Sequence, residues 1–282
     1  MVNYTLKTVT GILMILVCSC AKTPVRDAIS LYAEINKEAA PNTLTKKEKK
    51  LGWQLLFDGT TTTGWHGYNI SGVPDCWAIE DGALTMNTTG RAESQDIITD
   101  KPYRSFAFYA EFKLTKSANS GIIFQVAEDT LYHYPYETGP EFQVIDMEGW
   151  PDRLEEWQIC GANYAMHPPM VKPYKPVGEW NQALIVVDGN DVTFILNGEE
   201  TVKYTKNSEE WIKLRNSGKW ADYPDYGKYD EGHISLQNHG TKVWYRNIKL
   251  KEMYRVYNAK VAMGPQTGPR LHEQVSLLIG DM

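Results

Sequence analysis

The sequence has no cluster of basic residues and no excess of positive charge. Lysine and arginine number 29 against 35 aspartate and glutamate residues, which gives a formal net charge of −6 at pH 7. Proteins that bind nucleic acid need positive charge gathered on one surface to neutralise phosphates. The composition therefore argues against nucleic acid as a partner.

The sequence is also poor in cysteine, with four such residues in 282. Cys18 and Cys20 lie in the N-terminal leader, so only Cys76 and Cys160 remain for the folded part. Their spacing matches no zinc-binding motif. A single disulfide would suit an oxidising compartment, and two free thiols fit the spacing as well.

The apolar run near the N-terminus is too short to cross a bilayer as a helix. It reads GILMILV, from Gly11 to Val17, and follows Lys7. A membrane-spanning helix needs about 20 apolar residues, so this arrangement indicates a secretory signal peptide. The run ends in VCSC, which resembles a bacterial lipobox with Cys20 as the lipidated residue.

We therefore expect residues 1–20 to be a lipoprotein signal peptide. The protein would then belong to the cell envelope, anchored to a periplasmic or outer-membrane surface by acyl chains on Cys20. The alternative is a soluble secreted protein that is cut nearby.

The next segment, residues 21–50, is polar and rich in lysine and glutamate, and we interpret it as a tether with short helices. One helix is expected from Arg26 to Ala39. A second is expected near TLTKKEKKLG, where Thr45 and Glu48 can form a capping box.

From Leu51 onward the pattern consists of short strands separated by turn residues. In FAFYAEFKL, residues Phe106, Phe108 and Phe112 share one face, because side chains alternate along a strand. ALIVVDGNDVTFILNGEETVKY contains two successive hairpins, with turns at Asp188-Gly189-Asn190 and at Asn197-Gly198.

No long helix and no repeat of fixed period interrupts this series. The sequence thus predicts an all-β fold, a concanavalin- or laminarinase-like jelly-roll β-sandwich over residues 51–256, followed by a C-terminal tail at 257–282. The predicted core residues are Phe108, Phe112, Phe124, Val144, Phe194 and Leu236, together with Trp53, Trp65 and Trp77. The many aromatic residues, nine Trp and seventeen Tyr, also suit contacts with sugars.

One strand carries polar groups where threonine or valine would be ordinary. In GPEFQVIDMEGW, Phe142 and Val144 share one face, and Glu141 and Gln143 share the other. Asp146 falls out of step by one residue, so we predict a β-bulge after Val144 that returns it to the polar face.

A second strand, HISLQNHG, shows the same peculiarity. Its apolar residues face the core, so the residues that alternate with them share the opposite face. These are His233, Ser235, Gln237 and His239. We expect the two polar faces to meet on the concave side of the jelly roll, with Glu141, Asp146 and His239 converging there.

The spacing Glu-x-Gln-x-x-Asp is similar to the Glu-x-Asp-x-x-Glu catalytic strand of laminarinase-like glycoside hydrolases. Those enzymes use two carboxylates, one as nucleophile and one as general acid. Here Gln143 stands at the middle position and Asp146 at the last. This departure argues against an ordinary retaining glycosidase.

Several segments together resemble the 3-keto-disaccharide hydrolase domain family: EKKLGWQLLFDGTTTTGW, WAIEDGALTM, SGIIFQV, GPEFQVID, GEWNQALIVVDGNDVTFILNGEETVKY and GHISLQNHGTKVWYRNIKL. The resemblance runs from about Glu48 to Tyr254. It implies a concanavalin-like jelly roll in secreted, often lipid-anchored proteins. It also implies cleavage of glycosides whose sugar has been oxidised to a ketone at C3.

That reaction suits the polar residues. A C3 ketone acidifies the C2 proton, a base removes it, and the C1 substituent leaves by elimination or, after water addition, by net hydrolysis. His239 is a natural base or acid, and Glu141 or Asp146 would orient it. The three residues could also hold a divalent metal that polarises the ketone. No organic cofactor is expected.

Other candidates would bind the small carbohydrate substrate. Gln143 and Gln237 flank the acidic groups, Tyr132 and His133 precede the acidic strand as a sugar platform, and His167 lies in a long irregular segment between Asp146 and Glu179. Arg246 would bind a substrate oxygen or form an ion pair with Glu141.

A different class of function uses the same surface. A non-catalytic carbohydrate-binding module could present this concave face to sugar, but such a face needs mainly aromatic rings and amides. The cluster of Glu, Asp and His favours an enzyme.

Overall fold

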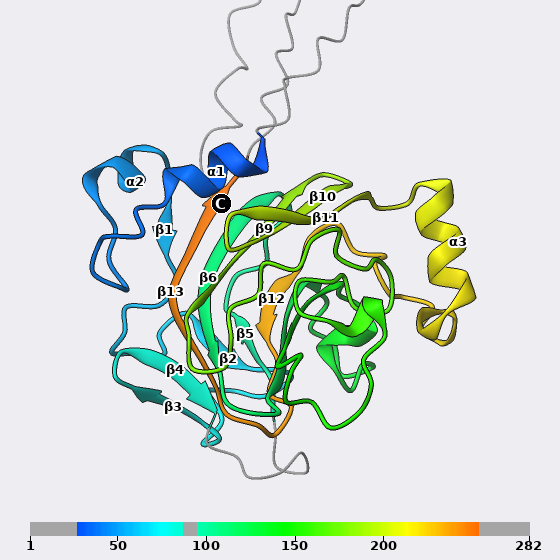
Figure 1. Cartoon of the computed structure of the whole chain (residues 1–282), viewed down its shortest axis with the longest axis horizontal. Coiled ribbons are helices and arrows are strands. Elements are labelled where there is room, and N and C mark those ends of the chain that lie inside the picture. Colours follow the sequence, from blue (N-terminus) through cyan, green and yellow to red (C-terminus); the bar gives the residue numbers. More distant parts are fainter. Residues whose placement is uncertain (1–26, 87–94, 254–282) are drawn as a thin grey trace, which may run out of the picture.

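The strands form two stacked antiparallel sheets in the computed structural model, which describes residues 27–86 and 95–253 (Figure 1). The larger sheet has the order β11-β10-β9-β6-β13-β4-β3, with β1 paired to β13. The smaller sheet has the order β2-β5-β12-β7-β8. This arrangement confirms the predicted jelly-roll sandwich.

The strands of the larger sheet are β1 (Gln54–Leu55), β3 (Trp77–Glu80), β4 (Ala83–Met86), β6 (Phe106–Leu114), β9 (Asn181–Asp188), β10 (Asp191–Leu196), β11 (Glu199–Thr205) and β13 (Val243–Glu252). Those of the smaller sheet are β2 (Trp65–Gly67), β5 (Ile97–Thr99), β7 (Asn119–Val126), β8 (Glu141–Ile145) and β12 (His233–Leu236). The helices are α1 (Ala28–Glu34), α2 (Lys46–Lys50) and α3 (Glu209–Ser217), with short 3-10 turns η2 (Pro135–Glu137), η3 (Glu156–Gln158) and η4 (Lys219–Asp222).

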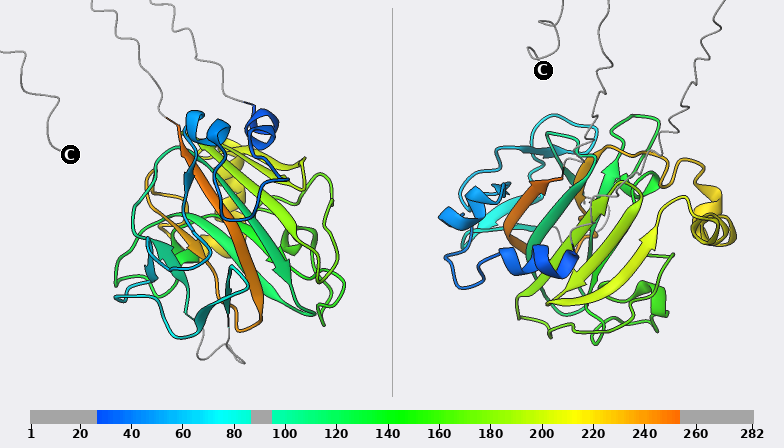
Figure 2. Two further views of the ribbon diagram at one scale, coloured as in Figure 1. Left: turned by 90° about the vertical axis from the view of Figure 1, so that its left-hand side faces the viewer. Right: turned by 90° about the horizontal axis from the view of Figure 1, so that it is seen from above.

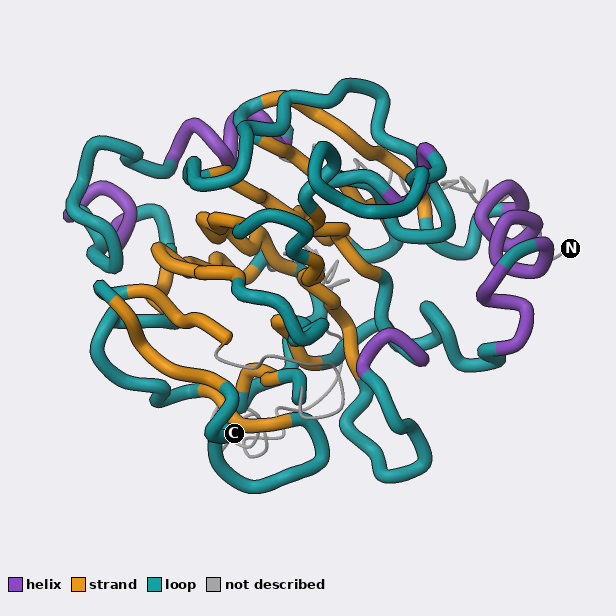
Figure 3. Tube along the Cα trace, turned by 60° about the horizontal axis from the view of Figure 1, so that its bottom comes forward, coloured by secondary structure: helices purple, strands orange, loops and turns teal. Residues whose placement is uncertain are grey.

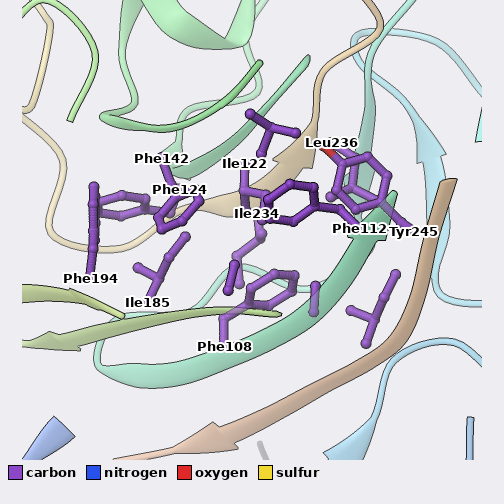
Figure 4. Close-up of a cluster of buried hydrophobic side chains, with 14 of the residues drawn as sticks. Phe108, Phe112, Ile122, Phe124, Phe142, Ile185, Phe194, Ile234, Leu236 and Tyr245 are labelled. Atoms are coloured by element: carbon purple, nitrogen blue, oxygen red, sulfur yellow. The ribbon is translucent and has the colours of Figure 1, made fainter. Parts of the chain in front are cut away.

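The core lies between the two sheets. Figure 4 shows Phe108 and Phe112 of β6 facing Phe124, Phe142 and Leu236 of the smaller sheet. The six predicted core residues of the strands are all buried there: Phe108, Phe112, Phe124, Val144, Phe194 and Leu236. Alternation along the strands was therefore sufficient to predict which side faces inward.

The larger sheet is also covered on its outer face. Ala28 and Leu31 of α1 pack with Trp53, Tyr109 and Val186 in a second apolar cluster. Strand β6 is consequently buried on both faces over most of its length. Trp53 is buried as predicted, although its place is in this outer cluster, whereas Trp65 and Trp77 lie in the core between the sheets.

The segment interpreted as a tether belongs to this packed body from residue 28 onward. Helix α1 is shorter than the predicted Arg26–Ala39, and α2 has the predicted capping box between Thr45 and Glu48. Glu48 also forms a fully buried ion pair with Lys249 of β13 at 2.8 Å. Apolar packing and this ion pair thus hold residues 28–50 on the sheet.

Helix α3 is an element that the sequence pattern does not predict. Ser208 caps its N-terminus by accepting from the backbone of Trp211, which is its one buried residue. Because a single buried side chain gives almost no periodic signal, the hydrophobic pattern does not predict this helix. The helix lies at the edge of the molecule away from α1 and α2 (Figure 2), and Figure 3 shows loops and helices surrounding the strands.

The structure decides two further expectations. The predicted bulge after Val144 is wrong, because β7 and β8 pair in continuous register from Glu141 to Ile145. Cys76 and Cys160, for which a disulfide was one alternative, are free thiols.

Residues 1–20, with the predicted signal peptide and Cys20, and the tail at 257–282 lie outside the described residues. Among the described residues, no helix is both long enough and apolar enough to span a membrane.

Candidate functional site

Two rows of side chains cross the outer face of the smaller sheet. In the first row Glu141 of β8 pairs with Ile123 of β7, which pairs with Ser235 of β12. In the second row Gln143 pairs with Gly121, and the carbonyl of Gly121 accepts from the backbone of Gln237 at 2.9 Å. Paired residues of antiparallel strands point to the same face, so Glu141, Gln143, Ser235 and Gln237 share this surface, as predicted.

Gly121 makes room for the carboxyl group of Glu141. A Cβ atom at residue 121 would overlap the Oε1 atom of Glu141, so the carboxyl lies over this glycine. Since Gly121 stands between Gln143 and Gln237 in the second row, the carboxyl lies between the strand positions of these two amide residues.

Burial makes this carboxyl a weak acid. Glu141 is 4% exposed, and desolvation raises its pKa to about 8, with Asp96 adding to the rise and Lys219 opposing it. The phenols of Tyr226 and Tyr245 are also buried, and this burial is the main reason that the pKa of each is raised. The negative charge of Glu141 adds to the rise in both cases. The site thus holds an acid whose pKa lies near neutrality.

Asp96 and Lys219 are members of the site that the sequence patterns miss. Asp96 precedes β5, two residues before Ile98 of the outer face, and its Oδ1 accepts from the backbone of Asn238 at 2.7 Å. The sequence signal for Asp96 is its position two residues before Ile98, because side chains two residues apart in a strand point to the same face. Lys219 comes from η4, 78 positions along the chain from Glu141 (219 − 141), so no local pattern links the two.

His239 stands close in sequence to the second row. It follows Gln237 by two residues, in the connection from β12 to β13, and it is half-buried. Asn238 holds the start of this segment, because its backbone N–H donates to Asp96 and its Oδ1 atom accepts from the backbone of Gly240 at 3.0 Å.

Asp146 does not join Glu141 on the polar face. Its carboxylate accepts from the backbone N–H groups of Ser117, Glu148 and Gly149 at 2.8, 3.1 and 3.0 Å. With no bulge in β8, Asp146 stays in step with Val144 and turns away from Glu141. Asp146 thus connects the turn at Ser117 with the turn at Glu148 and Gly149.

The expected metal triad therefore does not come together. Asp146 uses its oxygens on three backbone amides, and it is not on the surface that carries Glu141. Within residues 27–86 and 95–253, no group of three His, Cys, Asp or Glu side chains has the geometry to hold a metal ion. The residues present do not fit the expected divalent metal.

Arg246 lies on the other side of the sandwich. Its Nε forms an ion pair with Oε2 of Glu111 at 2.8 Å, on the outer face of the larger sheet, and its guanidinium is stacked on Trp180 at 3.9 Å. An ion pair was one of its two expected roles, although the expected partner was Glu141. Arg246 lies two residues after Trp244 in β13, so the two side chains point to the same face of the larger sheet.

The remaining candidates are held by other partners. His167 stacks on Tyr204 with ring centroids 4.6 Å apart, and its Nδ1 is 3.0 Å from the amide of Asn163. The hydroxyl of Tyr132 donates to Asp225 at 2.7 Å. His133 is exposed, and its backbone donates to Glu137.

The free edge of β8 is closed by the segment that follows η3. Tyr164 donates its backbone N–H to the carbonyl of Glu141 at 3.0 Å, and Gln143 donates to Ala162 at 3.0 Å. Tyr164 is thereby fixed beside Glu141. The segment from Gly161 to Tyr164 acts as an additional short strand along one wall of the site.

Residues 52–251 match the family described as the 3-keto-alpha-glucoside-1,2-lyase-like domain. A 3-keto-disaccharide hydrolase of Bacteroides thetaiotaomicron is 31% identical over 246 residues, which cover 78% of this chain and 85% of that protein.

Solved structures are similar as well. A Parabacteroides distasonis protein provisionally named a glycosyl hydrolase is 38% identical, with a TM-score of 0.72, and the match covers 76% of this chain and all of that one. A second protein of that organism with the same provisional name has a TM-score of 0.55 at 23% identity, covering 71% of this chain and 99% of its own, and it supports the fold alone.

Proposed function

We propose a specific reaction for this chain, which belongs to the 3-keto-alpha-glucoside-1,2-lyase-like family and is a glycoside-acting enzyme. It cleaves glycosides whose sugar carries a ketone at C3. The reaction begins with removal of the C2 proton. The electron pair of the C2–H bond forms an enolate, which then expels the C1 substituent. The first product is an unsaturated ketone, and addition of water at C1 completes a net hydrolysis.

The observation that carries this proposal is the place of Glu141. Its carboxyl lies over Gly121, between the strand positions of two amide residues that suit sugar hydroxyls, on a face that also holds Asp96. An elimination of this kind needs one group that accepts a proton and later releases it. We assign this role of proton acceptor to Glu141. A pKa near neutrality matches it, because such a carboxyl takes up and gives back a proton at similar cost.

His239 is the proposed donor of a proton to the departing oxygen. An imidazole is a common general acid and base in catalysis. The connection that bears it is fixed by the contacts of Asn238, beside the strand that carries Gln237.

The geometry supports elimination over an ordinary retaining mechanism. A retaining glycosidase needs two carboxyl groups about 5–5.5 Å apart on either side of the bond that breaks. Here the residue in the middle position is Gln143, and Asp146 turns toward backbone amides. The proposed chemistry does not use a carboxylate nucleophile, so neither feature hinders it.

A carbohydrate-binding module remains the second candidate function. A binding face needs no carboxyl with a raised pKa, and burying one costs stability. The buried position of Glu141 therefore favours catalysis.

The proposed location rests on the N-terminal sequence. We propose that Cys20 is acylated after removal of the leader, which anchors the enzyme at the cell envelope. Mass spectrometry of the mature protein tests this proposal, since an N-terminal Cys20 without acyl chains would contradict it.

The experiment that tests the activity compares two substrates. The purified protein is incubated with an aryl 3-keto-glucoside and with its unoxidised parent, and release of the aryl alcohol is measured. We expect release from the ketone alone, and slower release when C2 carries deuterium. Equal release from both sugars would mean that the ketone plays no part, and release from neither would favour the binding module.

A further inference from the structure

The ammonium group of Lys219 is enclosed by three aromatic rings. Its Nζ lies 4.6 Å from the ring centroid of Tyr136, 4.8 Å from that of Tyr164 and 4.5 Å from that of Trp220. A cation over an aromatic face is attracted by the ring quadrupole when it is within about 6 Å of the centroid. Three such contacts fix the position of a side chain that is otherwise exposed.

The rings themselves are held rigidly. Trp220 stacks on Tyr226 with centroids 4.0 Å apart and planes 8° apart, and its Nε1 donates to the carbonyl of Tyr164 at 3.2 Å. Tyr136 packs edge-on against Tyr223 at 5.9 Å. Segments from η2, η4 and the strand-like wall of the site thus meet around one cation.

This cation lies within electrostatic range of the proposed base. The positive charge of Lys219 acts on the Glu141 carboxyl, and Tyr164 joins the two groups because it contacts Lys219 by its ring and Glu141 by its backbone. Tyr164 lies opposite Glu141 across the antiparallel bridge between Phe142 and Asn163. Because paired residues point to the same face, the Tyr164 ring that contacts Lys219 lies on the face that carries the Glu141 carboxyl.

We propose that Lys219 binds the C3 oxygen of the substrate and stabilises the negative charge that this oxygen gains in the enolate. The inference rests on the proposed function of the site. Glu141 takes the C2 proton, the electron pair becomes the C2–C3 double bond, and the carbonyl electrons move to the C3 oxygen, where the ammonium group donates a hydrogen bond. When the enolate collapses, the C1–O bond breaks and the leaving oxygen is protonated, so Lys219 ends the cycle as it began.

A fixed cation also explains how the enzyme would select an oxidised sugar. A C3 hydroxyl cannot gain negative charge during the reaction, whereas a C3 ketone does. An interaction that strengthens only in the transition state raises the rate without tightening ground-state binding. Tyr136, Tyr164 and Trp220 would then be positioning residues.

The test replaces the charge and keeps the shape. Lys219→Met retains a long unbranched side chain without the cation. Lys113→Met is the matched control, because Lys113 also lies over two rings, Trp180 at 5.0 Å and Trp244 at 4.5 Å, but on the outer face of the larger sheet. The probe is an aryl 3-keto-glucoside, and kcat, KM and Tm are measured for both variants.

We expect Lys219→Met to lower kcat by about 10²–10³-fold, the usual loss for a group that stabilises a developing oxyanion, with KM and Tm nearly unchanged. Lys113→Met should behave as wild type. Lys219→Arg should recover part of the loss, because it restores a cation. The acidic limb of the kcat/KM profile should move to higher pH in Lys219→Met, since the cation that lowers the pKa of Glu141 is gone.

Two outcomes separate this inference from the proposed function. If wild type releases the aryl alcohol and Lys219→Met does so at the same kcat, the role of Lys219 is refuted and the elimination stands. An increase in KM alone would likewise reduce Lys219 to a substrate-binding group. Absence of release by wild type would overturn both proposals.

Discussion

The carboxyl group of Glu141 lies in the space that a side chain at Gly121 would occupy. The two residues belong to adjacent strands of the smaller sheet, and the glycine is the one position in its row without a side chain between Gln143 and Gln237. The absence of one Cβ atom thus creates the place where the proposed base can sit beside two amides. This relationship makes the position of Glu141 experimentally accessible without changing Glu141 itself.

Gly121→Ala should displace Glu141 and lower turnover of a 3-keto-glycoside. No positive φ is required at residue 121, so the backbone accepts alanine and the clash falls on the carboxyl. Gly149→Ala is the control, because its Cβ would overlap the Oδ2 atom of Asp146 in the same way. The control should lower Tm and affect turnover much less. Equal losses of turnover in both variants would show that the effect is not specific to Glu141.

Glu141→Gln and His239→Ala should each lower turnover by about 10²–10⁴-fold, the range expected for groups that transfer protons. Both side chains are proposed to act on protons, so thermal stability should not fall with activity. Aryl alcohol release and Tm are measured on the same preparations. Near-normal turnover in both variants would remove these residues from the mechanism.

The stability of the protein should depend on pH through Glu141. Its pKa is raised from 4.5 to about 8 in the folded state, so between these values the folded protein keeps a proton that the unfolded chain releases. The free energy of unfolding therefore falls as pH rises through this window. Glu141→Gln lacks this titration, so its stability relative to wild type should increase from about pH 5 to about pH 8. Urea unfolding at the two pH values tests the sign, and a constant difference would contradict it.

The buried ion pair between Lys249 and Glu48 offers a test of how the N-terminal segment is held. Both side chains are fully buried and their atoms are 2.8 Å apart. Lys249→Met should destabilise the protein by about 3–5 kcal/mol, because it leaves a buried charge without its partner. Adding Glu48→Gln should recover part of the loss, which chemical denaturation can measure. An additive double variant would mean that the two residues do not interact.

Phe124→Ala should cost about 3–5 kcal/mol of unfolding free energy, the usual penalty for removing a fully buried ring. Phe124 has no exposed surface and contacts the rings of Phe106 and Phe194. A change close to zero would be incompatible with its place between the sheets.

The sequence predicts the face of the sheet to which a side chain points wherever apolar and polar residues alternate along a strand. That pattern predicted the buried faces of β6, β8 and β12 and the shared surface of Glu141, Gln143 and Gln237. It failed at Asp146, where a bulge was assumed in order to place a third polar group on that surface. The continuous register and the three backbone amides around Asp146 explain the failure.

The alternation of apolar and polar residues specified the inner faces of the sandwich and the row that contains Glu141, because side-chain direction in a strand depends on parity. Tertiary structure decided what surrounds that row. Asp96, Lys219 and Tyr164 come from separate segments. Contacts between distant segments depend on how loops pack, and no local pattern of residues encodes that packing.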